Sequence, residues 1–159
     1  KENEINDLCK ILNPKNEWGK ITLIIRMGTD LINEKLPLLI KTIKKNKHNV
    51  LWVCDPMHAN TYKLANGYKT RHFNTILKEL ECFFSIHKKE KTIPGGVHFE
   101  LTGDNVTECL GGAHKITDTD VEKKYETACD PRLNNEQSLE LAFLITNLLR
   151  NNRLIRRII

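Results

Sequence analysis

Residues 49–58 read NVLWVCDPMH, an apolar run that ends in a group of polar and ionisable residues. Two other segments have the same form: ITLIIRMG at residues 21–28 and GVHFELTG at residues 96–103. Near-continuous apolar strands are typical of a parallel sheet that is buried on both faces. We therefore expect three strands here, and we expect the first two to be buried on both sides.

Apolar residues recur at helical spacing between and after these runs. The pattern predicts helices over residues 36–44 and 71–87, and a last helix from about residue 135 to 150, capped by Asn134 or Ser138. Strands that alternate with helices indicate an α/β fold, and the loops at the carboxyl ends of its strands carry the chemistry. Three strands cannot close a barrel, so we expect the chain to be a slice of something larger.

The composition excludes several classes of protein. The chain has 40% hydrophobic and 28% charged residues and a formal charge of +5, which fits one globular domain or a part of one. We expect no membrane partner, because no apolar run approaches a spanning length and the N-terminus does not resemble a signal peptide. Basic clusters at residues 41–47, 88–91 and 150–157 lack interleaved aromatic residues. They favour solvated surfaces over a nucleic-acid site, so no nucleic-acid partner is expected.

Five cysteines are present, with no pair spaced as C-x-x-C. This spacing excludes a structural zinc knuckle and is typical of free thiols in a reducing compartment. We therefore expect a cytoplasmic protein, or a plastid protein where a transit peptide lies upstream.

Arg26 and His58 each follow a predicted strand. A guanidinium at a strand end suits a phosphate or a carboxylate, which it binds with two parallel hydrogen bonds. The alternative for Arg26 is a structural ion pair with a nearby acid such as Asp30. A neutral imidazole is the commonest metal ligand, but a single histidine such as His58 is more often an ordinary buried or surface residue.

Glu100 lies in an otherwise apolar strand, where an unpaired acid is costly. His98 lies two residues before Glu100, so both side chains are expected on the same side of the strand. One of the two would be a metal ligand and the other a residue that supports it. Asp130 precedes a proline before the last helix, where a simple turn is the alternative. Together with His58, these two acids have the donor types for Mn²⁺, Co²⁺, Fe²⁺ or Zn²⁺.

Several longer strings resemble one known family, the class II 3-deoxy-D-arabino-heptulosonate-7-phosphate (DAHP) synthases. The resemblance extends from about residue 18 to 150, in conserved order and spacing. One departure is Ala59, where the family usually has glycine. The strings are CDPMHANT (54–61), KTRHF (69–73), PGGVHFELTG (94–103), VTECLGG (106–112), YETACDPRLN (125–134) and QSLELAF (137–143).

The resemblance implies a fold and a reaction. The fold is a (β/α)8 TIM barrel, of which residues 1–159 would be the C-terminal segment, about the last three βα units, with the N-terminal part absent. The reaction condenses phosphoenolpyruvate with erythrose 4-phosphate and releases phosphate. This transferase step opens the shikimate pathway to chorismate and the aromatic amino acids. The complete enzyme is expected to be a homo-oligomer.

The resemblance also implies roles for individual residues. His58, Glu100 and Asp130 match three ligands of a divalent metal, Mn²⁺ or Co²⁺ first and Zn²⁺ or Fe²⁺ as alternatives. The remaining ligand of the family is a cysteine on the first strand, and none of the five cysteines here lies in a matching motif. Arg26 matches an arginine that binds phosphoenolpyruvate. Lys69 and Arg71 match a basic segment close to the aldehyde substrate.

An incomplete ligand set predicts that the chain alone is inactive. The alternative hypothesis is a catalytically inactive fragment or a split-gene module, which needs an N-terminal partner to complete the barrel and the metal site.

Overall fold

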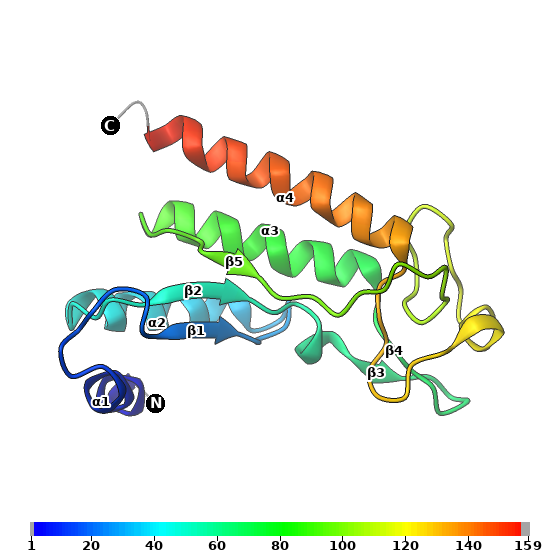
Figure 1. The fold of residues 1–159 in the computed structure, drawn as a ribbon, viewed down its shortest axis with the longest axis horizontal. Helices are drawn as coiled ribbons and strands as arrows, with labels where there is room; N and C mark the ends of the chain where they lie inside the picture. Colours follow the sequence, from blue (N-terminus) through cyan, green and yellow to red (C-terminus); the bar gives the residue numbers. More distant parts are fainter. Residues whose placement is uncertain (1, 157–159) are drawn as a thin grey trace.

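A three-stranded parallel sheet forms the centre of the computed structural model, which describes residues 2–156 and the side chains of residues 4–151 (Figure 1). The neighbouring strands pair in parallel, and this agrees with the predicted α/β class. All three carboxyl ends therefore lie at the same edge of the sheet. In spatial order the strands are β1 (Thr22–Ile25), β2 (Leu51–Cys54) and β5 (Gly96–Val97).

The third strand is shorter than the run predicted over residues 96–103, because β5 ends at Val97. β2 ends before Pro56, and since proline has no N–H it cannot extend the hydrogen-bond ladder on that side. The chain pairs instead with Leu133, whose N–H donates to the carbonyl of Glu100 over 3.0 Å. Glu100 therefore lies in a loop past the strand, and this loop is fastened to the segment before the last helix.

One face of the sheet is buried and the other is open. Trp52 of β2 packs in the core with apolar residues of α2 (Ile32–Lys45) and α3 (Phe73–Lys89). Ile24 and Leu51 point to the opposite face and are 48% and 44% exposed. The expectation of burial on both faces is therefore wrong within this chain, because its helices cover only one side.

The last helix, α4 (Asn135–Arg156), begins at a reciprocal cap and extends further than predicted. The Gln137 N–H donates to the Asn134 side chain over 2.9 Å, while the Asn134 N–H donates to the Gln137 side chain over 3.2 Å. Asn134 is thus the capping residue of the two that were considered. The sequence pattern predicts an apolar stripe on this helix that includes Leu139, Leu141 and Leu149; Leu141 is buried, but Leu139 is 59% and Leu149 37% exposed. The C-terminal basic cluster falls partly outside the described residues, which end before Arg157.

The remaining elements lie before the sheet or near the carboxyl ends of its strands (Figure 1). They are α1 (Glu2–Leu12), the short 3-10 helices η1 (His58–Asn60) and η2 (Val121–Lys124), and an antiparallel hairpin of β3 (Tyr62–Lys63) and β4 (Lys69–Thr70). All five cysteines are free thiols. Within residues 2–156, none of the helices has both the length and the apolar character that crossing a membrane requires.

His87, in the last turn of α3, is a buried histidine outside the candidate site. Its ring lies between Trp52 and Phe83, with centroid distances of 5.4 and 4.4 Å, and its Nδ1 is 2.7 Å from the Thr92 hydroxyl. Burial lowers the pKa of His87 from 6.5 to about 4. At neutral pH the imidazole is therefore neutral and acts as part of the core.

This shifted pKa predicts a pH-dependent stability. Below pH 6.5 His87 is protonated in the unfolded chain but stays neutral in the folded chain. The free energy of unfolding therefore falls as the pH drops from 6.5 to about 4. We expect His87 to account for a loss of about 2 kcal/mol at pH 5. Urea unfolding of the protein and of His87→Phe at pH 7 and pH 5 measures this loss. Equal pH dependence in the two proteins would contradict the assignment, and His114→Phe, at an exposed histidine, is the control.

Candidate metal centre

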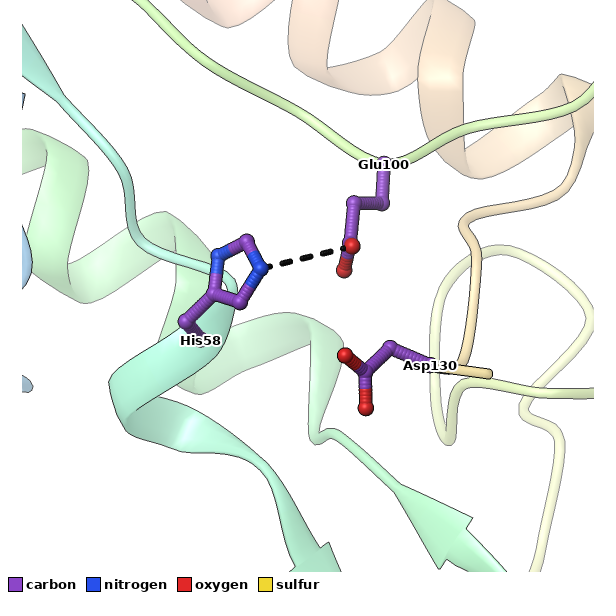
Figure 2. A group of neighbouring side chains, drawn as sticks. All are labelled: His58, Glu100 and Asp130. Atoms are coloured by element: carbon purple, nitrogen blue, oxygen red, sulfur yellow. Dashed lines mark ion pairs between the residues drawn. The ribbon is translucent and has the colours of Figure 1, made fainter.

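His58, Glu100 and Asp130 come together beyond the carboxyl ends of β2 and β5 (Figure 2). His58 begins η1 just after β2, Glu100 follows β5, and Asp130 lies in the loop before α4. One ligand atom from each side chain lies within 4.8 Å of the other two, and all three residues are partly buried. The three residues singled out as metal ligands from the sequence are thus neighbours in space.

Asp55 orients the His58 ring. Its carboxylate is fully buried, and its Oδ2 accepts a hydrogen bond from His58 Nδ1 over 2.8 Å. Burial raises the pKa of Asp55, but hydrogen bonds from the His58 ring and from the N–H groups of Met57 and His58 outweigh burial, so the net pKa is below its usual value. The ionised acid holds the proton of the ring on Nδ1 and leaves Nε2 free to bind a metal.

Arg71 holds the Glu100 side chain in place. The guanidinium is fully buried, and its Nη1 lies 2.6 Å from Glu100 Oε2. This contact is an ion pair; the hydrogen bonds of the guanidinium go to the Thr61 hydroxyl over 2.7 Å and to the carbonyl of Pro131. Arg71 therefore links the His58, Glu100 and Asp130 loops, and its burial leaves no part of it exposed to solvent.

Lys69 has a different environment from Arg71. Its side chain is 41% exposed, and its Nζ donates to Asp130 Oδ1 over 2.8 Å. The hydrogen bond from Lys69 is the main reason why the pKa of Asp130 lies below its usual value. Asp130 is thus a carboxylate with one oxygen bound to an ammonium group, beside an exposed lysine that can approach an anion.

Arg26 lies next to His58 because both bind the same acid. Its Nε is 2.6 Å from Asp55 Oδ2, and its side chain is 47% exposed. The structural ion pair considered for Arg26 exists, but its partner is Asp55 and not Asp30. Because this pair uses Nε, the two Nη groups of the half-exposed guanidinium are not part of it.

Glu79 is a site residue that the sequence did not reveal. It lies on α3, is fully buried, and accepts a hydrogen bond from the Gly28 N–H over 2.9 Å and from the Asn60 side chain over 2.5 Å. Burial raises the pKa of Glu79, and the hydrogen bond from Asn60 opposes that rise. Glu79 ties the loop after Arg26 to the loop of His58. The sequence signal that could have identified Glu79 is the position of this acid on the apolar face of the helix predicted over residues 71–87.

The donor set fits a divalent cation. With the neutral ring donating from Nδ1 to Asp55, Nε2 is an acceptor that faces the acceptor Oε1 of Glu100 at 3.4 Å, whereas a protonated ring forms the ion pair drawn in Figure 2. Two facing acceptors with a further carboxylate nearby are stabilised by a cation between them. One imidazole nitrogen with two carboxylates suits Mn²⁺, Co²⁺, Fe²⁺ or Zn²⁺, whereas Ca²⁺ and Mg²⁺ prefer oxygen ligands alone. His98, stacked on His58 with a centroid distance of 6.2 Å, is a neighbour outside this group.

A parallel sheet with ionisable side chains at its carboxyl ends defines an α/β protein with a candidate metal site. The segments that form this site are the same motif strings that resemble a known family. The chain belongs to the class-II DAHP synthetase family, whose family model matches residues 1–146.

Three curated relatives are similar over 140 residues, or 88% of this chain. A protein of Mycolicibacterium smegmatis named phospho-2-dehydro-3-deoxyheptonate aldolase AroG is 54% identical. Proteins of Streptomyces coelicolor and Streptomyces lividans named phospho-2-dehydro-3-deoxyheptonate aldolase are each 51% identical. The matched region spans 30% and 31% of the length of the first two relatives and 95% of the third.

Proposed function

We propose that this chain is the C-terminal part of a DAHP synthase, which condenses phosphoenolpyruvate with erythrose 4-phosphate and releases phosphate. One observation carries the proposal: three residues far apart in the sequence, His58, Glu100 and Asp130, have ligand atoms within 4.8 Å of one another. The family membership and the names of the relatives support the same reaction. The product feeds the shikimate pathway to chorismate and the aromatic amino acids.

We further propose that residues 1–159 contribute about the last three βα units of a (β/α)8 barrel. The parallel strands, their sequential order and the alternating helices support this placement. Ile24 and Leu51 on the open sheet face are apolar residues of the kind that fill a barrel interior. In this proposal the preceding part of the enzyme supplies the other strands and the cysteine ligand. We also propose that the complete enzyme is a homo-oligomer in the cytoplasm, or in a plastid where a transit peptide precedes it.

The residues of this chain then have distinct tasks in the reaction. Arg26, fixed at Nε by Asp55, binds the phosphate or carboxylate of phosphoenolpyruvate with its exposed end and so orients C3 toward the aldehyde. Lys69, exposed beside Asp130, attracts the phosphate of erythrose 4-phosphate. Arg71 holds the Glu100 carboxylate in a position where it can bind the same metal ion as His58. A bound divalent metal, Mn²⁺ or Co²⁺ foremost, supplies Lewis-acid polarisation of the aldehyde carbonyl.

Phosphate release by two forms of the protein tests this function. With phosphoenolpyruvate, erythrose 4-phosphate and added Mn²⁺ or Co²⁺, we expect the full-length protein to release phosphate. We expect no release from residues 1–159 alone, because they lack a ligand and most of the barrel wall. Turnover by the isolated chain would refute the incomplete-site hypothesis. Absence of turnover in the full-length protein would favour the alternative, a catalytically inactive module.

A further inference from the structure

Glu108 is a buried acid that carries an unusual number of hydrogen bonds. Its side chain is fully buried, and both of its oxygens accept. Oε1 accepts from the N–H groups of Glu126 and Thr127 over 3.1 and 2.9 Å, and from Arg132 Nη2 over 2.7 Å. Oε2 accepts from the N–H and the Nε of Arg132, over 2.7 and 3.0 Å. All five donors belong to residues 126–132.

These donors lie on both sides of Asp130. Residues 125–134 form neither a helix nor a strand, and their regular backbone pairing is confined to the bridge between Leu133 and Leu101, which lies after Asp130. Glu108 binds the chain at Thr127, before Asp130, and at Arg132, after it. A residue between two such anchors has little freedom to move, because each anchor is a charge-assisted hydrogen bond inside the protein.

The ionised state of Glu108 matches this arrangement. Burial raises the pKa of the Glu108 carboxyl, but the hydrogen bonds from Arg132 and from the N–H groups outweigh burial, and the net pKa lies below its usual value. The acid is therefore a carboxylate at neutral pH, with every partner a donor. A neutral side chain of the same size cannot satisfy the same five donors.

We propose that Glu108 is a positioning residue that sets Asp130 at the distance from His58 and Glu100 that metal binding requires. This inference rests on the proposed function. The residue touches neither metal nor substrate, since it acts through the backbone of residues 126–132. Its effect is therefore expected in the metal affinity of the folded protein, and not only in its stability.

Glu108→Gln in the full-length protein tests this role directly. The amide replaces one of the two carboxylate oxygens with an NH₂ group, which donates and cannot accept. Because Oε1 accepts three hydrogen bonds and Oε2 accepts two, the loop loses an anchor on one side of Asp130. Asp120→Asn is the matched control. Asp120 also accepts from a backbone N–H and from a lysine, at Thr117 and Lys123, but it holds nothing in residues 126–132.

Mn²⁺ affinity is measured by titration of the metal-free proteins, at a temperature where circular dichroism shows them folded. We expect the dissociation constant for Mn²⁺ to rise by about 10- to 100-fold in Glu108→Gln, the range seen when partners of metal ligands are lost. We expect Asp120→Asn to bind Mn²⁺ as the wild type does. Binding of phosphoenolpyruvate without metal is expected to stay unchanged, because Arg26 is held by Asp55.

Unchanged Mn²⁺ affinity in a folded Glu108→Gln variant would overturn the positioning role and assign Glu108 to stability alone. Should that variant not fold, Arg132→Gln gives the answer, because it removes two side-chain donors and keeps the three backbone bonds. A rise in its dissociation constant supports the inference, and wild-type affinity contradicts it. Failure of the wild-type protein itself to bind Mn²⁺ would count against the proposed function, so the two failures are distinguishable.

Discussion

Replacing His58 with alanine in the full-length protein is expected to raise the dissociation constant for Mn²⁺ by ~100-fold or more, above the effect of losing a partner of a ligand. The substitution removes the only nitrogen from the His58, Glu100 and Asp130 group. Isothermal titration with Mn²⁺ measures the loss, and phosphate release is expected to fall with it.

His114→Ala is the matched control for that experiment. His114 also contacts a carboxylate, with its Nε2 2.6 Å from Glu136, but it is 57% exposed and lies outside the ligand group. We expect this variant to bind Mn²⁺ with wild-type affinity. If His58→Ala also bound Mn²⁺ as the wild type does, the ligand assignment would be wrong even if the reaction assignment were right.

Asp55→Asn is expected to damage two binding functions at once. Its Oδ1 accepts from the N–H groups of Met57 and His58, and its Oδ2 from His58 Nδ1 and Arg26 Nε. An asparagine that keeps its oxygen toward the backbone presents its NH₂ group to His58 and Arg26. The imidazole must then carry its proton on Nε2, where it blocks the metal, and Arg26 loses its anchor.

For Asp55→Asn we expect the dissociation constant for Mn²⁺ to rise about 10- to 100-fold. Weaker binding of phosphoenolpyruvate in the absence of metal is expected as well. Calorimetric titrations with each ligand separate the two effects. Asp30→Asn is the control, because Asp30 is the exposed acid that the sequence offered as the partner of Arg26. Loss of phosphoenolpyruvate binding in Asp30→Asn, with normal binding in Asp55→Asn, would contradict this account of Arg26.

The strands and the candidate ligands could be predicted because their signals are local. An apolar run such as residues 49–54 is visible without any knowledge of its neighbours. An acid such as Glu100 in apolar surroundings is equally visible, and the family strings then connected it with His58 and Asp130. The short length of β5 could not be predicted in this way, because it depends on where β2 ends and on the distant pairing with Leu133.

The acids that support the ligands were missed for a related reason. Asp55 and Glu108 appeared in the sequence only as members of the family strings, and Glu79 only as a residue of the helix predicted over residues 71–87. Their importance comes from partners far along the chain: Gly28 and Asn60 for Glu79, and residues 126–132 for Glu108. A single sequence shows that an acid is present at a position, but not which distant hydrogen-bond donors offset the cost of burying it.

The wide separation of His58, Glu100 and Asp130 along the chain has a consequence for the lifetime of the protein. A cation bound by all three would act as a crosslink between segments that otherwise meet only through side chains and a few backbone bonds. A ligand that binds only the folded state adds about 2.7 kcal/mol of stability at a free concentration one hundred times its dissociation constant. Metal supply would then affect the abundance of this protein, since metal starvation would expose these segments to proteolysis.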